Sequence, residues 1–377
     1  MTMMMIQSGF SQAPRLAAAA LAAVSLLVAW GGASAADAPY PAPVEGDYVI
    51  DAFEFQSGET LDELRQHYRT IGTLKKDAQG RATNAVLIMH GTTGSGAGFL
   101  QERFANVLFA PGGALDAREH FIILPDGIGH GASSKPSDGL RMRFPKYTYD
   151  DMIKAQHRLL TEHLGVDRLR LMMGTSMGGM HAWVWGYTYP DFVEALMPLA
   201  SLPVEIAGRN RMQRKMIIDA IMSDPDWKGG DYGQKPMRGM RMATFPLIFM
   251  VSSPYQYQQR APTRQEAETY LDELASRYAD RLEPNDTIYA FDASRNYNPS
   301  PHLSKITAPL IAINSADDQV NPPELGILER EIKKIEGAKA IVLPITPETS
   351  GHGTHTSAAI WEAHLRALLK ESSAAAR

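Results

Sequence analysis

A glycine-rich stretch holds the serine best placed to act as a nucleophile. The sequence GTSMG at 174–178 fits the pattern Gly-x-Ser-x-Gly and follows an apolar run, 169–173, that is typical of a strand. In such an elbow a strained turn between strand and helix lifts the serine hydroxyl above the sheet edge, and the glycines leave room for the turn. Ser176 is therefore the predicted nucleophile. The alternative is a small-residue turn with an inert serine.

A serine becomes nucleophilic when a histidine takes its proton and a carboxylate orients that histidine. The apolar run 308–313 leads to Asp317 and Asp318, and the loop after the last predicted strand holds His352 and His355. Asp318 fits a D-x-V-x-P spacing and His352 follows the loop glycine, so these two are the predicted acid and base. Asp317 and His355 remain the alternatives, and His355 is expected at the start of the final helix.

A second glycine-rich loop could stabilise the oxyanion that forms during acyl transfer. The sequence HGTTGSG at 90–96 follows the apolar run 84–89, and it lacks the lysine and the spacing of a phosphate-binding loop. An oxyanion hole takes one backbone N–H from such a loop and another from the residue after the nucleophile. We predict Thr92, with Thr93 behind it, and Met177 as donors. A flexible turn without this role is the alternative.

Alternating strands and helices must position these groups. Helices are predicted at 149–164, 325–335 and 358–369, and strands at 48–55, 64–71, 84–89, 121–125, 169–173, 195–199, 308–313 and 340–344. Strand, helix and strand in succession imply parallel crossovers. The chain order Ser, Asp, His is that of α/β-hydrolases. We therefore predict an α/β-hydrolase fold with a mostly parallel sheet, helices on both faces and an inserted helical lid.

The domain boundaries follow from where this alternation stops. Segment 203–300 is rich in methionine and basic residues and shows no strand-helix alternation, so it is the predicted lid between two parts of the core, 48–202 and 301–377. Its methionines could contact an apolar substrate or fill a helical core. Residues 36–47 are predicted to be a linker rich in proline and alanine.

The first 35 residues are predicted to be a signal peptide. Arg15 precedes an apolar run, 16–30, and the sequence ASA at 33–35 suits cleavage before Ala36. An anchor helix is the alternative, but the run is shorter than the ~20 residues needed to span a membrane. The mature protein is therefore expected in the periplasm or outside the cell, without stable insertion in the membrane.

Composition excludes several classes of protein. A net charge of −5 without a dense Lys/Arg run disfavours nucleic acid as a partner. The absence of cysteine excludes disulfides, a lipid-modified cysteine and thiolate metal sites. No metal or other cofactor is expected, because no further ligand cluster joins His352 and His355. The remaining singled-out histidines are interpreted as structural or loop-lining: His90, His130, His181 and His302.

With these residues in place, the chain resembles the homoserine O-acetyltransferase family of α/β-hydrolases. The stretch FPKYTYDDMIKAQ at 144–156 resembles the family block F-P-x-x-T-I-x-D-M-V-x-A-Q, and GTSMGGMH resembles its elbow G-G-S-M-G-G-M-Q. The sequences MQR at 212–214 and DPDWKGGDY at 224–232 resemble its lid motifs V-Q-R and D-P-x-W-x-G-G-x-Y. This resemblance implies that Arg214 lies near the acyl-acceptor pocket, where a guanidinium can grip a carboxylate in two places. A lid salt bridge is the alternative.

Departures from the family pattern bear on the reaction. The family loop H-A-L-T-G is HGTTG here, its glutamine after the elbow is His181, and its G-H-D-x-F-L is GHGTHT at 351–356. The family reaction implies cytosolic acetyl-CoA, which conflicts with an export signal. We therefore predict an exported serine hydrolase that cleaves a small carboxylic ester through an acyl-enzyme. O-acyl transfer from acetyl-CoA to a small hydroxyl acceptor is the alternative, and a non-catalytic binding protein is a third. The oligomeric state stays open, with a homodimer among the options.

Overall fold

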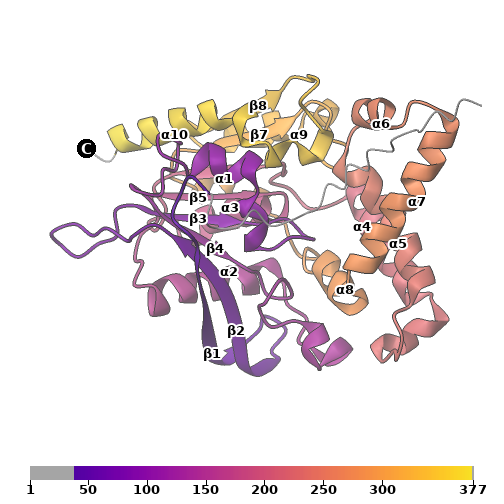
Figure 1. Cartoon of the computed structure of the whole chain (residues 1–377). Coiled ribbons are helices and arrows are strands. Elements are labelled where there is room, and N and C mark those ends of the chain that lie inside the picture. The colour runs from indigo at the N-terminus through magenta and orange to yellow at the C-terminus, as the bar shows by residue number, and fades with distance from the viewer. Residues whose placement is uncertain (1–37, 376–377) are drawn as a thin grey trace, which may run out of the picture.

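An eight-stranded sheet runs through the centre of the molecule (Figure 1), in the order β1-β2-β4-β3-β5-β6-β7-β8. The computed structural model describes residues 38–375, so the predicted signal peptide lies outside the described residues. β1 and β2 pair antiparallel, β2 is antiparallel to β4, and every other pairing is parallel. The strands are β1 Val44–Glu54, β2 Thr60–Ile71, β3 Ala85–Met89, β4 Phe121–Pro125, β5 Leu171–Thr175, β6 Leu196–Leu199, β7 Ile311–Ser315 and β8 Lys339–Leu343.

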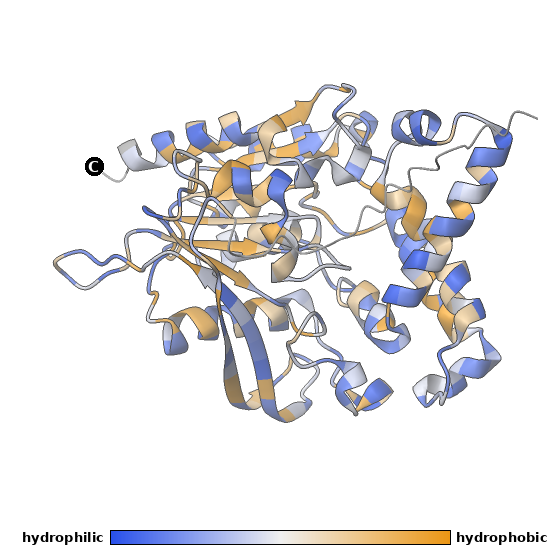
Figure 2. Ribbon diagram, viewed as in Figure 1, coloured by the Kyte–Doolittle hydropathy of each residue, from blue (hydrophilic) through white to orange (hydrophobic). Residues whose placement is uncertain are grey.

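Helices cover both faces of this sheet. Along β3, Val86 and Ile88 pack with α1 (Glu102–Leu108) and α10 (Glu362–Ala375), whereas Leu87 and Met89 pack on the other side. That other side holds α2 (Tyr149–Arg158) and α3 (Met177–Thr188). The central strands are accordingly hydrophobic along their length (Figure 2), as parallel strands buried on both faces are. The predicted α/β-hydrolase fold is confirmed.

Five helices between β6 and β7 form the inserted lid, beside the sheet in Figure 1. They are α4 Gly208–Met222, α5 Met237–Val251, α6 Pro254–Arg260, α7 Arg264–Arg281 and α8 Pro284–Asp292. The lid has an apolar core of its own, which includes Met240 and Met250, while Met212 and Met242 are exposed. These lid methionines therefore divide between helix packing and the surface.

The boundaries of several elements differ from the sequence predictions. β1 begins at Val44, so the last four residues of the predicted linker belong to a strand. The helix predicted at 149–164 ends at Arg158 and continues as a wider π-helical turn, Leu159–His163. The final helix begins at Glu362 rather than at 358, after a short 3-10 turn. Within the described residues, no helix is long and apolar enough to cross a membrane.

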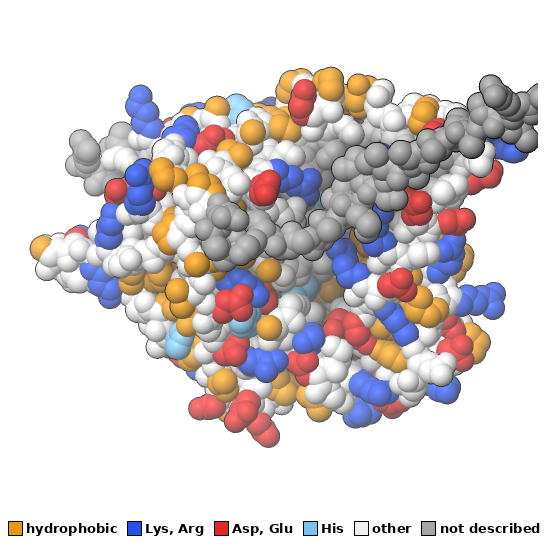
Figure 3. Space-filling model, viewed as in Figure 1, with side chains coloured by type: hydrophobic (Ala, Val, Ile, Leu, Met, Phe, Trp, Pro, Cys, Tyr) orange, Lys and Arg blue, Asp and Glu red, His pale blue; other side chains and the backbone are white. Residues whose placement is uncertain are grey.

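The molecular surface carries charges of both signs. On the face shown in Figure 3, basic and acidic side chains are interspersed, and no continuous basic patch is visible.

The elbow is the tightest junction of the core. Ser176 has φ 56° and ψ −111°, a conformation that non-glycine residues rarely adopt. Two residues later the first turn of α3 approaches β3 so closely that a Cβ on Gly178 would lie 1.9 Å from the carbonyl oxygen of Met89. The small residue is therefore required by backbone contact, and the helix can begin directly above the strand ends.

Replacing Gly178 by Ala should destabilise the protein, because the added methyl group meets a backbone carbonyl that cannot rotate away. We expect the free energy of unfolding to fall by about 1–3 kcal/mol, the usual cost of overpacking, with reduced catalytic activity. Urea unfolding would measure the change. Gly233→Ala is the control, since a Cβ there meets nothing within 4 Å. Equal stability of the two variants would contradict this account of the elbow.

Candidate active site

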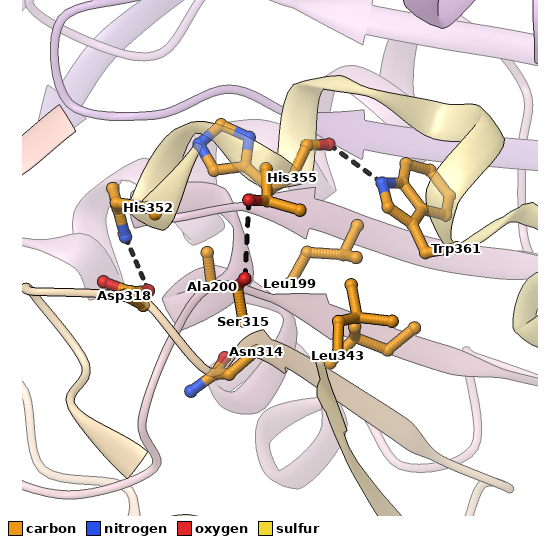
Figure 4. A pocket seen from close by; sticks show the side chains of 12 residues that line it. Leu199, Ala200, Asn314, Ser315, Asp318, Leu343, His352, His355 and Trp361 are labelled. Atoms are coloured by element: carbon orange, nitrogen blue, oxygen red, sulfur yellow. Dashed lines mark hydrogen bonds and ion pairs between the residues drawn. The ribbon is translucent and has the colours of Figure 1, made fainter. Parts of the chain in front are cut away.

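Three side chains from three loops meet above one end of the sheet. His352 Nε2 lies 2.8 Å from Ser176 Oγ, and His352 Nδ1 lies 2.9 Å from Asp318 Oδ2. Ser176 precedes α3, Asp318 follows β7, and His352 lies in the 3-10 turn Gly351–Thr356 after β8. Figure 4 shows the His352 and Asp318 side chains facing each other. The structure thus brings the predicted serine, base and acid into one hydrogen-bonded chain.

The environment of Asp318 favours its carboxylate form. Its Oδ1 accepts hydrogen bonds from the backbone N–H groups of Val320 and Asn321, at 2.7 and 3.0 Å. Burial alone would raise the pKa of Asp318, but His352 and these N–H groups lower it below its ordinary value. An ionised Asp318 accepts a hydrogen bond from the Nδ1–H of His352, which leaves the Nε2 lone pair free to accept the hydroxyl proton of Ser176.

Asn321 is a contributor that the sequence reasoning missed. Its Nδ2 donates to Asp318 Oδ2 at 3.2 Å and to the Ala200 carbonyl at 2.8 Å, so it fixes the carboxylate against the end of β6. The D-x-V-x-P stretch contained Asn321, but the spacing alone gave no sign that its side chain turns back to the acid.

The two alternative residues have other positions. Asp317 accepts hydrogen bonds from Ser315 Oγ, from Gly351 N at 2.9 Å and from Thr349 Oγ1 at 3.2 Å, so it holds the loop that carries His352. The expectation that His355 starts the final helix is wrong, because it lies in the same 3-10 turn as His352. Burial first, and the neighbouring His352, lower the pKa of His355 to about 3, so His355 is neutral.

A small cavity lies behind the Asp318–His352 pair, lined also by His355, Ser315 and Trp361 (Figure 4). Its volume of about 10 Å³ has room for about one water molecule and none for a substrate. Nδ1 of His355 has no hydrogen-bond partner among the described residues. The cavity therefore belongs to the support of the histidine and is not the substrate site.

The predicted oxyanion loop lies against the elbow. A Cβ on Gly91 would be 3.4 Å from Cβ of Ser176. The Gly91 carbonyl accepts hydrogen bonds from His90 Nδ1 at 2.8 Å and from Gly94 N at 2.9 Å. Because C=O and N–H point in opposite directions across a trans peptide, these bonds fix the direction of the Thr92 N–H. Met177 is the first residue of α3, where an N–H has no partner within its own helix.

The other histidines near the loop have structural contacts. Nε2 of His90 accepts from the Gly127 N–H at 2.9 Å, and Nε2 of His130 lies 2.8 Å from the Thr92 carbonyl oxygen. Burial lowers the pKa of His90 to about 4 and lowers the pKa of His130 and of His181, so neutral rings are favoured. His302 lies farther along the chain, with its ring 5.0 Å from that of Tyr187. No group of three potential metal ligands occurs within residues 38–375.

Arg214 is a buried residue of α4 in the lid. It is 2% exposed, its Nε donates to Asn210 Oδ1 at 2.9 Å, and its Nη1 donates to Ser294 Oγ at 3.2 Å. Among the described residues no carboxylate lies within 4.0 Å of its guanidinium, and the nearby ion pair is formed by Arg211. The alternative of a lid salt bridge is therefore wrong, and within residues 38–375 this buried cation has no counter-ion.

The fold and this hydrogen-bonded serine, histidine and aspartate define the α/β-hydrolase class. A family model described as "alpha/beta hydrolase fold" matches residues 84–355. The chain belongs to this family, in its homoserine O-acetyltransferase-like branch, and is an enzyme of that type.

Two proteins are similar to this chain in sequence, and one solved structure is similar to it in fold. A protein named probable acyltransferase from Methanothermobacter thermautotrophicus is 31% identical over 279 residues, which cover 74% of this chain and 84% of that protein. The homoserine O-acetyltransferase of Moorella thermoacetica is 35% identical over 269 residues, covering 62% and 69%. An acetylester hydrolase from Corynebacterium glutamicum has a TM-score of 0.76 at 21% identity, covering 87% and 96%, which shows a shared fold.

Replacing Asp318 by Asn should reduce kcat by about 10⁴-fold with little change in stability, because the amide favours the wrong histidine tautomer. Steady-state kinetics on an activated ester and thermal unfolding would measure both effects. Asp317→Asn is the matched control. It should lower the unfolding temperature, because Asp317 holds the loop of His352, while the kcat of the folded protein stays much closer to that of the wild type. The reverse ranking of the two kcat values would contradict the assignment of Asp318.

Proposed function

We propose that this chain is an exported serine esterase that cleaves a small carboxylic ester through an acyl-enzyme. The observation that carries the proposal is the hydrogen-bonded chain from Ser176 through His352 to Asp318. The α/β-hydrolase family and the similar acyltransferase and acetylester hydrolase support acyl chemistry. The hydrogen bond between His352 and the carboxylate of Asp318 supports histidine as the base.

In the proposed mechanism, His352 Nε2 takes the proton from Ser176 Oγ as that oxygen bonds to the ester carbonyl carbon. The N–H groups of Thr92 and Met177 hold the oxyanion, each contributing about 3 kcal/mol to transition-state stabilisation. The tetrahedral intermediate then collapses, the bond to the alcohol oxygen breaks, and His352 returns the proton to the departing alcohol. Water repeats the sequence on the acyl-enzyme and releases the carboxylic acid and free Ser176.

O-acyl transfer is the second candidate function, and the names of the similar sequences favour it. The two reactions share the acyl-enzyme and differ in the acceptor, which is water for an esterase and a bound alcohol for a transferase. Arg214 is the proposed substrate-binding residue in both cases, because a buried guanidinium with no counter-ion among the described residues suits a carboxylate on the alcohol. The proposed export favours hydrolysis, since acetyl-CoA is not expected outside the inner membrane.

The purified protein should hydrolyse p-nitrophenyl acetate and transfer little acetyl group from acetyl-CoA to homoserine. Release of p-nitrophenol and of free CoA would measure the two reactions. Ser176→Ala should keep the circular dichroism spectrum of the wild type and lose about 10⁴-fold or more in kcat. Rapid acetyl transfer with negligible hydrolysis would overturn the esterase proposal, and wild-type turnover by Ser176→Ala would overturn the nucleophile.

Export predicts a mature protein that begins at Ala36. Expression of the full chain in a Gram-negative host, followed by fractionation and intact mass measurement, should find the processed form in the periplasm or medium. Recovery of the uncleaved chain, with residues 1–35 retained, would contradict the proposed signal peptide.

A further inference from the structure

His130 is a buried histidine whose two ring nitrogens both face carbonyl oxygens. The residue is 6% exposed, its Nε2 lies 2.8 Å from the Thr92 oxygen, and its Nδ1 lies 2.9 Å from the Ile128 oxygen. Burial lowers the pKa of His130, so the neutral ring, which carries one N–H, is favoured. Because a carbonyl oxygen can only accept, the neutral ring holds one of the two carbonyls, and the choice decides what the residue does.

The Thr92 carbonyl belongs to the second of the two peptide groups that flank Thr92, the predicted oxyanion donor. The first peptide group is held at the Gly91 oxygen, which accepts from His90 Nδ1 at 2.8 Å and from Gly94 N at 2.9 Å. A hydrogen bond from His130 to the Thr92 oxygen fixes the second. Because a peptide group is planar, holding both planes fixes φ and ψ of Thr92 and the direction of its N–H.

The loop that carries His130 is tied to the core and to the predicted oxyanion loop. Asp126, which is 1% exposed, accepts from Ala132 N at 2.9 Å through Oδ2 and from Gly96 N at 2.7 Å through Oδ1. Arg69 of β2 donates from Nη1 to the same Oδ1 at 3.1 Å. The Asp126 carboxylate therefore joins the loop of His130 to the end of the oxyanion loop, and the His130 ring reaches the middle of that loop from a fixed base.

The alternative is that His130 only closes the turn of its own loop. Ile128 lies two residues before His130, so a hydrogen bond from Nδ1 would be local. Other contacts already close this turn, among them the hydrogen bond from Gly129 N to the Ser134 oxygen at 2.9 Å. Within the described residues, His130 is the one hydrogen-bond donor that reaches the Thr92 oxygen. The contact with Thr92 is therefore the one that other groups do not duplicate.

We propose that His130 is a positioning residue, whose Nε2–H holds the Thr92 carbonyl and thereby aims the Thr92 N–H at the oxyanion of the acyl-transfer reaction. His130 acts through the loop and not on the substrate. This inference rests on the proposed function for the reaction, whereas the contact between His130 and Thr92 does not. Loss of the contact should slow formation of the charged tetrahedral intermediate and leave binding of the uncharged ester little changed.

Two single substitutions separate the two carbonyl contacts of His130. The glutamine amide in His130→Gln takes the place of Nε2 and keeps a donor for Thr92, whereas the shorter amide in His130→Asn takes the place of Nδ1 and keeps a donor for Ile128. With p-nitrophenyl acetate, His130→Asn should lower kcat about 10- to 100-fold and keep KM within about twofold, because a misplaced donor costs transition-state stabilisation. His130→Gln should keep most of the wild-type kcat. Thermal unfolding and circular dichroism would measure the folding of both variants.

Equal kcat values for the two folded variants, or the larger loss in His130→Gln, would overturn the inference and leave the esterase proposal standing. The rate at which a fluorophosphonate labels Ser176 is a second measure that needs no hydrolysis, because phosphonylation also places charge on an oxygen in the oxyanion hole. Slow labelling of His130→Asn alone would support the positioning role even if the wild type cleaved no ester, a result that would overturn the esterase proposal instead. Equal labelling rates in all three proteins would overturn the positioning role.

Discussion

The close packing of the elbow on the sheet is the constraint on which the other features depend. Ser176 is held at positive φ because Gly178 lets the first turn of α3 rest on the carbonyl of Met89. The parallel pairing of β3 with β5 places Met89 beside Gly174, so the loops that follow both strands leave the sheet at the same edge. The Ser176 hydroxyl, the predicted oxyanion loop and the N-terminus of α3 therefore lie at the same edge of the sheet.

The histidine reaches this edge through a second set of contacts. Asp317 and Asp318 are adjacent in the sequence, yet one holds the loop at Gly351 while the other receives the ring of His352. Asp317 therefore fixes the backbone of the loop, and Asp318 fixes the orientation of the imidazole ring. This division explains why two neighbouring acids at a strand end are both buried.

Much of this arrangement could be predicted from local patterns. Apolar runs located the parallel strands, the Gly-x-Ser-x-Gly spacing located Ser176, and the order of serine, acid and histidine implied the fold. Contacts that depend on how distant segments dock could not be predicted in this way. Asn321 turns back to Asp318, and His355 shares the turn of His352, because tertiary packing decides both contacts. The start of β1 at Val44 was missed because pairing with β2 extends the strand into a proline-flanked segment.

The central claim is that Ser176 is the nucleophile of an acyl-transfer site. Labelling of the wild-type protein with a fluorophosphonate probe, followed by peptide mass spectrometry, tests it most directly, since such probes bond covalently to activated serines. We expect a single stoichiometric adduct on the peptide that contains Ser176, and none in Ser176→Ala. An unlabelled wild type, or an adduct on another serine, would contradict it.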